Sequence, residues 1–147
     1  MKIYLFTIVF IIISSIHAQT RKTIQPNKYF PINVTVKSSD ASTLVTMDAA
    51  ATSPVDMYIM NPVQFVEYSI LASKGVEFEY DKENSRIGVK QVELKNVEIY
   101  EHGSKIVMFN PGNSILTITY NIETKGRQYE PGKLNSLLFV IFFDSRI

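Results

Sequence analysis

The chain has 147 residues, of which 46% are hydrophobic and 12% aromatic, with 15 basic residues, 14 acidic residues and no cysteine. The absence of cysteine excludes thiol catalysis, disulfide cross-links and cysteine-ligated metal sites. The balance of charges argues against nucleic acid or an anionic membrane surface as the main partner.

Residues 1–18 have the organisation of a secretory signal peptide. Met1 and Lys2 form a short positive start, residues 3–13 are an apolar run with one threonine, and Ala18 ends a polar-to-small exit. The run is too short for a spanning helix, which needs about 20 apolar residues; an uncleaved anchor or a buried strand is the alternative. Removing 18 residues from 147, one lysine among them, leaves 129 residues with 14 basic and 14 acidic groups. We therefore expect one secreted or lumenal domain with no transmembrane helix in its mature form.

The next 100 or so residues have the pattern of a β-rich domain. Residues 19–28 are polar and are expected to form a flexible leader, and residues 29–123 to form the folded domain. Apolar and polar residues alternate along 29–37, as they do in a half-buried strand. Strands are also predicted at 43–48 and 55–60, with a turn between the first two strands and a loop at 49–54.

One helix is predicted, over residues 61–74. Asn61 is of a type that caps free amides, Pro62 suits the first helical position, and Gln64 follows three residues after the cap. Gly75 is a natural terminator for this helix. An apolar stripe with spacings of three and four residues is formed by Val63, Val66 and Ile70.

After the helix, residues 76–80 alternate strictly between apolar and acidic types and predict a strand. A polar turn at 81–85 would pair this strand with residues 86–90 in a hairpin. The apolar phase then changes from odd to even positions and back again, which a strand can do only through a bulge or a break. We therefore expect irregularities near Gln91 and Asn96.

A second hairpin is predicted over residues 105–123, where two apolar runs flank Asn110, Pro111, Gly112 and Asn113. Proline fixes the φ angle that a turn needs, and glycine tolerates the positive φ that follows it. Residues 124–147 are expected to form a polar loop, up to residue 135, and an apolar C-terminal strand at 137–143. A remnant of a lipid-anchor signal is the alternative for that apolar run.

These elements predict an all-β fold after removal of the signal peptide. Short strands separated by turns, with a single short helix, are typical of an antiparallel β-sandwich of jelly-roll or immunoglobulin-like type. About eight strands are expected.

Residues with catalytic or metal-binding chemistry are few. The mature chain has one histidine, His102, beside a glycine in a predicted turn, so we expect an exposed loop residue and no triad member. One histidine without cysteine leaves too few ligands for zinc. The sequence therefore predicts no catalytic residue, no metal ligand set and no cofactor.

An acidic cluster formed by Glu77, Glu79, Asp81 and Glu83 is the main exception. Glu77 and Glu79 would share one strand face, about 7 Å apart along the strand. Paired carboxylates at such separations serve glycoside hydrolysis, and a set of hard oxygen ligands binds calcium. A solvated strand face has the same alternating pattern, and it is the reading that we favour.

Two further features bear on extracellular recognition. Asn33 begins the acceptor sequence Asn33-Val34-Thr35 for N-glycosylation, on the polar side of its strand. Several tyrosines could form a recognition surface or could equally form core and cross-strand pairs. These are Tyr58, Tyr68, Tyr80, Tyr100 and Tyr129.

Residues 55–68, VDMYIMNPVQFVEY, and the later VMFNPGNSILTITYNI resemble secreted β-sandwich modules of the GOLD (Golgi dynamics) type. Such modules have a strand of the form V-D-x-Y-hydrophobic, a short segment with an aromatic residue, and a late alternating strand after an asparagine turn. The resemblance covers residues 29–123 and implies a non-catalytic lumenal or extracellular interaction domain. It carries over no binding residue. The coiled coil, spanning helix and cytoplasmic tail of cargo-receptor GOLD proteins have no counterpart here.

Two functions from different classes follow. The first is a secreted, non-enzymatic domain that binds a protein or glycan partner through loops or an exposed sheet face, because sandwich binding sites need no special residue types. The second is a small secreted hydrolase that uses Glu77 and Glu79. A concave pocket lined by these two carboxylates would favour the second function, and an open convex face the first.

Overall fold

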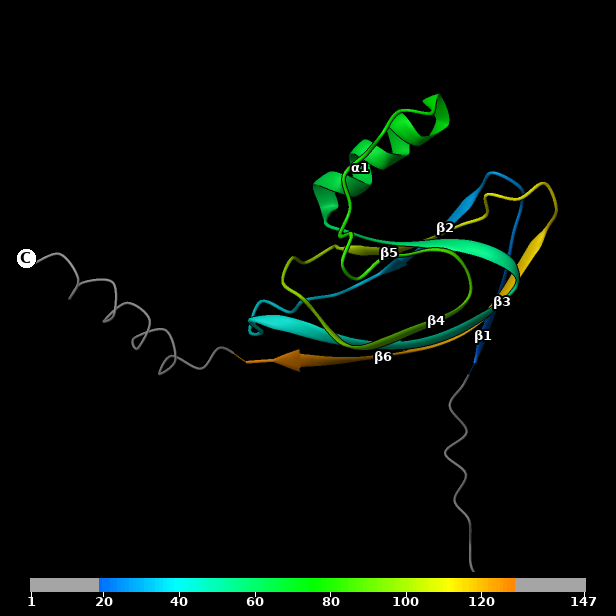
Figure 1. Ribbon diagram of the computed structural model, residues 1–147. Helices are drawn as coiled ribbons and strands as arrows, with labels where there is room; N and C mark the ends of the chain where they lie inside the picture. The colour runs from blue at the N-terminus through cyan, green and yellow to red at the C-terminus, as the bar shows by residue number, and fades with distance from the viewer. Residues whose placement is uncertain (1–18, 129–147) are drawn as a thin grey trace, which may run out of the picture.

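A computed structural model describes residues 19–128, and this part of the chain is mostly β-structure with one short helix (Figure 1). The predicted all-β class is thus confirmed. The elements in chain order are β1 (Thr20–Ile24), β2 (Tyr29–Asn33), β3 (Ser42–Met60), α1 (Pro62–Leu71), the 3₁₀ turn η1 (Ala72–Lys74), β4 (Arg86–Ile99), β5 (Lys105–Phe109) and β6 (Leu116–Arg127).

The long strand β3 organises a single antiparallel sheet of six strands. One edge of β3 pairs with β4, and the other edge is shared between β6 and β5. β6 pairs along residues 42–51 and β5 along residues 56–60. β1 then pairs with β6, and β2 with β5. The sheet therefore has two halves. In the β3–β6 half, β6 pairs with β3 and β1, and in the β3–β5 half, β5 pairs with β3 and β2. Strands β3 and β4 run through both halves.

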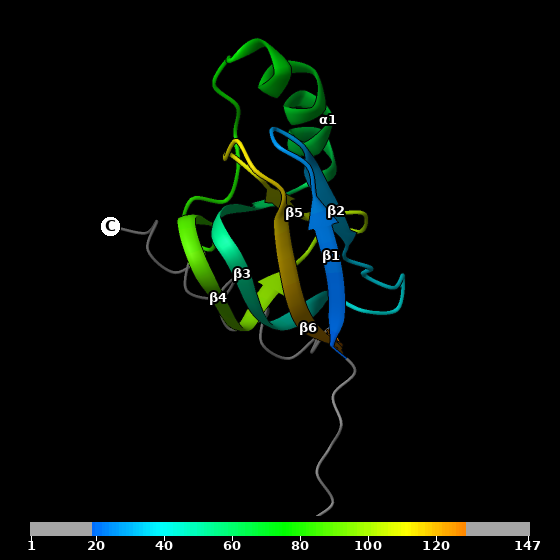
Figure 2. The same ribbon diagram turned by 90° about the vertical axis from the view of Figure 1, so that its right-hand side faces the viewer.

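The sheet bends where these two halves meet (Figures 1 and 2). The β3–β4 register shifts between Ala50 and Val55, and the partner ribbons are interrupted at 25–28 and 110–115. The bend lets alternate residues of both halves enclose one aliphatic core. Its fully buried members, with exposed fractions of 0–1%, are Val34, Val45, Met47, Val55, Met57, Leu94, Ile106, Met108, Leu116 and Ile118.

The two segments that follow β2 and precede β5 cover the side of the aliphatic core that the bent sheet leaves open. The segment after β2 and the segment before β5 join through hydrogen bonds from Val34 N to Ser104 O (2.9 Å) and from Gly103 N to Val34 O (3.3 Å). Val34 and Val36 are both buried in the aliphatic core. These two valines therefore seal the core between the ends of the two halves.

Asn110 lies at the bend and is fully buried although it is a polar residue. Its Nδ2 donates to Ile24 O (3.0 Å) and to Ser114 O (2.8 Å), and its Oδ1 accepts from Gly112 N (2.9 Å). Its backbone also exchanges hydrogen bonds with Asn27 and Lys28. One side chain thus ties the break between β1 and β2 to the break between β5 and β6.

The predicted hairpin at 105–123 is wrong. β5 and β6 pair with β2 and β1 and with different parts of β3, and both are antiparallel to β3. The chain therefore continues in one direction through 110–115. The turn residues are present, but Asn110 uses its side chain to satisfy the corner instead of reversing the chain.

Other boundaries also differ from the predicted ones. Residues 20–24, expected in a flexible leader, form β1 through backbone pairing with β6 although only Ile24 is buried. The predicted loop at 49–54 lies inside β3, and β6 continues to Arg127 where a polar loop was expected. The described residues contain six strands instead of about eight, because β3 and β4 each join segments that look separate in sequence. The predicted signal peptide and the strand at 137–143 lie outside the described residues.

The predicted β4 irregularities are supported. Asn96 has a φ of 50°, and β4 has one more residue than β3 between the pairs Val45–Val97 and Met47–Leu94. Near Gln91 the register also shifts, but the extra residues belong to β3. The change of apolar phase along β4 therefore reports a bulge at one place and the bend of the partner strand at the other.

Candidate functional site

The outer face of the β3–β5 half carries a second, separate hydrophobic layer. Tyr58 and Met60 of β3 and Val107 of β5 point away from the aliphatic core, because successive strand residues alternate between faces. Helix α1 covers this face (Figure 1). It contributes Tyr68 to the layer. The extended segment after η1, residues 76–80, which we name the strap, also packs here through Phe78 and Tyr80.

Helix α1 begins as predicted. Asn61 Oδ1 accepts from Gln64 N (2.8 Å), and Gln64 Oε1 accepts from Asn61 N (3.0 Å), which makes a capping box with Pro62 in the first turn. Gly75 ends η1 with a φ of 66°. Tyr68 is the buried residue of α1. The stripe recognised in the sequence is instead exposed: Val63 to 64%, Val66 to 57% and Ile70 to 52%.

The predicted hairpin of residues 76–90 is wrong. Residues 76–80 form no strand within the described part of the chain, although their alternation is real. Phe78 and Tyr80 turn towards the aromatic layer and are partly buried, whereas Glu77 and Glu79 are exposed. Both rings contact Tyr58 edge-to-face, and Phe78 also contacts Tyr68 of α1, while the backbone of the strap is unpaired.

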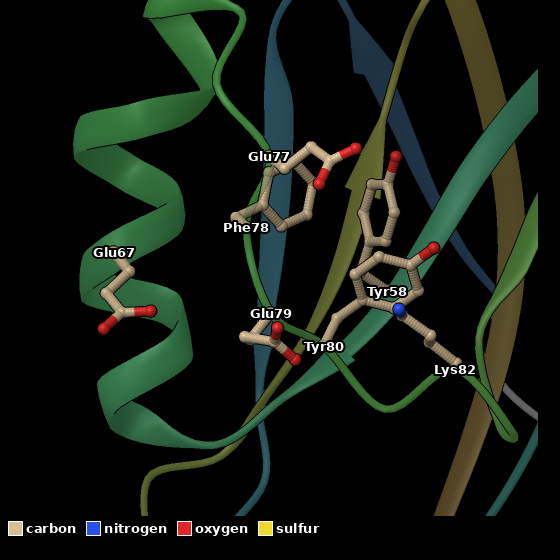
Figure 3. A pocket seen from close by; sticks show the side chains of 7 residues that line it. All are labelled: Tyr58, Glu67, Glu77, Phe78, Glu79, Tyr80 and Lys82. Carbon is tan, nitrogen blue, oxygen red and sulfur yellow. The ribbon is translucent and has the colours of Figure 1, made fainter.

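A pocket of about 560 Å³ lies around the strap, and Figure 3 shows its lining. Glu77, Glu79 and Lys82 come from the strap and the residues after it, and Glu67 comes from α1. The rings that complete the lining belong to Tyr58, Phe78 and Tyr80. Three carboxylates and one ammonium group thus surround a set of aromatic rings.

These rings belong to a dense aromatic cluster. The ring centroid of Tyr58 lies 5.0 Å from that of Tyr80, 5.3 Å from that of Phe78 and 6.0 Å from that of Tyr68. Phe78 and Tyr68 are 4.8 Å apart in an edge-to-face arrangement. Edge-to-face pairs of this kind stabilise fixed ring orientations by about 0.5–1.5 kcal/mol each. The cluster therefore holds the strap in place without sheet hydrogen bonds.

Asp56 supports Tyr58 from the same face of β3. The Tyr58 hydroxyl donates to Asp56 Oδ2 (3.2 Å), and Asp56 Oδ1 accepts from Gly88 N (2.8 Å). Burial, followed by the nearby Asp56 carboxylate, raises the pKa of Tyr58 well above its ordinary value, so the hydroxyl stays protonated. The V-D-x-Y pattern is therefore a structural pair that orients a pocket residue.

Tyr68 is the anomaly of this layer. It is 2% exposed, and its hydroxyl is the one buried side-chain polar atom in residues 19–128 that has no hydrogen-bond partner. Burial is the main cause that raises the pKa of Tyr68 above its ordinary value. Tyr68 also lines a second cavity of about 310 Å³ between α1 and the strap, together with Tyr58, Ala72, Val76, Phe78 and Phe109. Glu77 and Gly75 complete that lining.

The acidic cluster separates into two roles. Glu77 and Glu79 line the pocket, whereas Asp81 caps its own turn by accepting at Oδ1 from Glu83 N (3.1 Å) and Asn84 N (3.2 Å). Glu83 is exposed and is not among the pocket residues. No group of three or more acidic or histidine side chains in residues 19–128 is placed to bind a metal ion. The four residues are therefore not brought together as the calcium alternative would need.

The remaining candidate residues lie elsewhere. His102 is exposed in a turn, as predicted, with Nδ1 2.9 Å from Val36 O. Asn33 is exposed at the end of β2, where its Oδ1 accepts a hydrogen bond from Lys105. Tyr100 is exposed and bonds Glu98, away from the aromatic cluster, and Tyr129 lies outside the described residues.

Sequence reasoning missed Glu67, Lys82 and Asp56 as members or supports of the pocket. Asp56 could have been found, because it stands two residues before Tyr58 and shares its strand face. Glu67 could not, because only the packing of α1 brings it near the strap.

Comparison of the chain with protein-family models and with curated proteins finds no match. Within residues 19–128, no helix has the length and apolar character that crossing a membrane requires.

Proposed function

We propose that this chain is a secreted, non-enzymatic binding domain that recognises a protein or a glycan through the pocket around the strap. The supporting observation is the combination of exposed carboxylates with fixed aromatic rings in one concavity. Carboxylates accept hydrogen bonds from hydroxyl or amino groups, and rings offer flat apolar area at low entropic cost. Secretion or lumenal location rests on the signal-like residues 1–18.

The GOLD-like resemblance agrees with this proposal in kind, since GOLD modules are interaction domains. The V-D-x-Y segment forms the β3 end and positions Tyr58, and the following segment forms α1 with its partly buried Phe65. The proposed site lies beside both of these segments.

A small hydrolase remains the second candidate, because Glu77 and Glu79 line a pocket instead of an open convex face. Such an enzyme would use one carboxyl group as the acid and the other as the nucleophile or base. Binding is favoured over hydrolysis, since the two glutamates are exposed on an unpaired segment and no side chain hydrogen-bonds either one in residues 19–128. Hydrolases instead hold their catalytic carboxyls in place with supporting contacts.

A glycan array and capture of secreted proteins, both with the purified full chain, test the proposal. We expect the Glu77→Gln/Glu79→Gln double variant to lose most binding of the captured ligand. The matched control is Asp48→Asn/Glu93→Gln, which removes two exposed carboxylates from facing positions on β3 and β4. Equal binding by both variants would place recognition outside the pocket.

The same preparations distinguish binding from hydrolysis. For a binding domain, the ligand is recovered intact after long incubation, and neither His102→Ala nor a chelator changes binding. Release of a cleaved product that stops in Glu77→Gln or Glu79→Gln would establish the hydrolase instead.

A further inference from the structure

The backbone of the strap is available for pairing. Residues 77–80 make no hydrogen bond to the protein within residues 19–128, through either backbone or side chain. Both ends are nevertheless fixed: Val76 N donates to Leu71 O (3.3 Å), and Asp81 N donates to Ile59 O (2.9 Å). The rings of Phe78 and Tyr80 hold the middle against Tyr58. An extended segment that is held in place with free N–H and C=O groups is a template for an added strand.

The charges beside the strap define what such a strand should carry. Glu67, Glu77 and Glu79 are exposed around the pocket, and Lys82 is the one basic residue of its lining. Glu77 and Glu79 lie two positions apart, about 7 Å in an extended chain, which is the spacing of alternate side chains in a paired strand. Lysine or arginine at alternate positions of an added strand would meet both carboxylates on the exposed face of the strap.

The unpartnered Tyr68 hydroxyl is independent of these charges. Buried polar groups are almost always hydrogen-bonded, so a donor without an acceptor beside a 310 Å³ cavity suggests a missing partner. The cavity lies between α1 and the strap and shares Tyr58, Glu77 and Phe78 with the pocket. Because the hydroxyl itself has almost no accessible surface, an acceptor oxygen of a bound segment would reach Tyr68 only after a local shift of the rings that line the cavity.

We propose that the strap binds an extended peptide segment by strand addition, with lysine or arginine at alternate positions facing Glu77 and Glu79 and an acceptor oxygen on Tyr68. This inference rests on the proposed binding function and names its partner as a basic, extended segment of protein.

Selection from random ten-residue peptides displayed on phage, against the secreted full chain, is the first test. We expect enriched peptides to carry lysine or arginine at every second position. Enrichment of acidic or neutral sequences, or no enrichment, would overturn the inference. If the inference fails in this way but a glycan or protein still binds through the pocket, the proposed function stands. If no basic peptide is enriched and no glycan or protein binds through the pocket, the inference and the proposed function are both rejected.

Variants of the chain test the three contacts with the most enriched peptide. The Glu77→Gln/Glu79→Gln variant should lose at least tenfold in affinity at low salt, and less at high salt because exposed charges are screened. Asp48→Asn/Glu93→Gln should bind like the wild type. Tyr68→Phe keeps the ring but removes the donor, so it should weaken binding several-fold while the free protein remains folded. Unchanged affinity in both Glu77→Gln/Glu79→Gln and Tyr68→Phe would contradict the proposal.

Pairing itself has a distinctive signature. In a paired strand, the N–H groups of every second residue point towards the partner and the others point away from it. Two peptides are therefore compared, one N-methylated at the odd residues and one at the even residues, and only one of these two parities loses the N–H groups that face the strap. We expect one parity to abolish binding and the other to preserve it, with slowed hydrogen exchange at residues 77–80 of the bound protein. Equal tolerance of both parities, or protection confined to other residues, would reject strand addition.

Discussion

The two faces of the β3–β5 half differ although the same strands build them. The inner face contributes Met57, Ile59 and Ile106 to an aliphatic core that both halves of the sheet enclose. The outer face, one residue out of phase, contributes Tyr58, Met60 and Val107 to an aromatic layer under α1 and the strap. The inner face is covered by sheet, and the outer face by segments without sheet pairing.

This difference separates residues that stabilise the fold from residues of the proposed binding site. The inner core is aliphatic and closed, so its residues act mainly through burial and close packing. The outer layer has two cavities, an unsatisfied hydroxyl and free carboxylates. Such features cost stability and are retained where a site needs them. The comparison leads to four predictions, from the largest expected effect to the smallest.

Replacing one residue on each face tests the comparison directly. Ile106→Ala removes a fully buried side chain from the inner core and should lower the free energy of unfolding by about 2–5 kcal/mol. Phe78→Ala removes a partly buried ring from the outer layer and should cost about 1–2 kcal/mol, since much of its surface already meets the cavities. Denaturant unfolding measures both. An equal or larger loss in Phe78→Ala would show that the outer layer is as important for stability as the core.

Asn110→Ala tests whether the bend of the inner core depends on one polar side chain. The variant removes three hydrogen bonds and leaves the carbonyl of Ile24 buried without its partner, so we expect a loss of about 2–4 kcal/mol. Asn113→Ala, at an exposed position of the same corner, is the control and should be within about 0.5 kcal/mol of wild type. A loss no greater than in this control would mean that the backbone alone sets the corner.

Asn61→Ala weakens the cover of the outer layer without touching the rings. Loss of the cap on Gln64 N should lower the free energy of unfolding by about 1 kcal/mol. Asn61→Ser keeps a capping oxygen and should restore most of it. Stability unchanged in Asn61→Ala would show that Asn61 does not stabilise the helix start.

Glu98 is the counterpart of the free pocket glutamates. Hydrogen bonds from Ser42 (2.6 Å) and Tyr100 (2.9 Å), with Arg127 nearby, lower the pKa of Glu98. Because the folded-state pKa is lowered, the ionised form stabilises the fold above the unfolded-state pKa, and this contribution is lost as the pH falls through the folded-state pKa. NMR titration should show a higher pKa for Glu98 in Ser42→Ala. The stability difference between the two proteins should be larger at pH 6 than at pH 3; a difference independent of pH would contradict this link.

Much of the local structure was predictable because its causes are local. The capping box at Asn61 and Gln64, the terminator Gly75 and the bulge at Asn96 each depend on residues a few positions apart. The exposed turn position of His102 was also predictable. The alternation of residues 76–80 predicts which side chains turn inward, but the strand and hairpin predicted from it are wrong, because Phe78 packs against rings that are distant in sequence or on another element.

The candidate site was predictable only in part, through Glu77 and Glu79. The stripe Val63, Val66 and Ile70 has helical periodicity, yet it faces away from the sheet because the bulkier Tyr68 and Phe65 fill the contact with β3 and β5. Periodicity predicts that a helix has an apolar face. Which face is buried depends on which side chains fill the space against the surface that the helix packs on.

The sequence by itself determined an all-β chain with one capped helix, because strand alternation, turn residues and caps act within a few positions. Only the tertiary structure decided that β5 and β6 follow one another along β3, that the sheet bends at Asn110, and that Glu67 lines the same pocket as the strap and Tyr58. These arrangements depend on contacts between residues far apart in the chain. Such contacts form where burial and hydrogen bonding of the whole sheet are satisfied together, which no local pattern specifies.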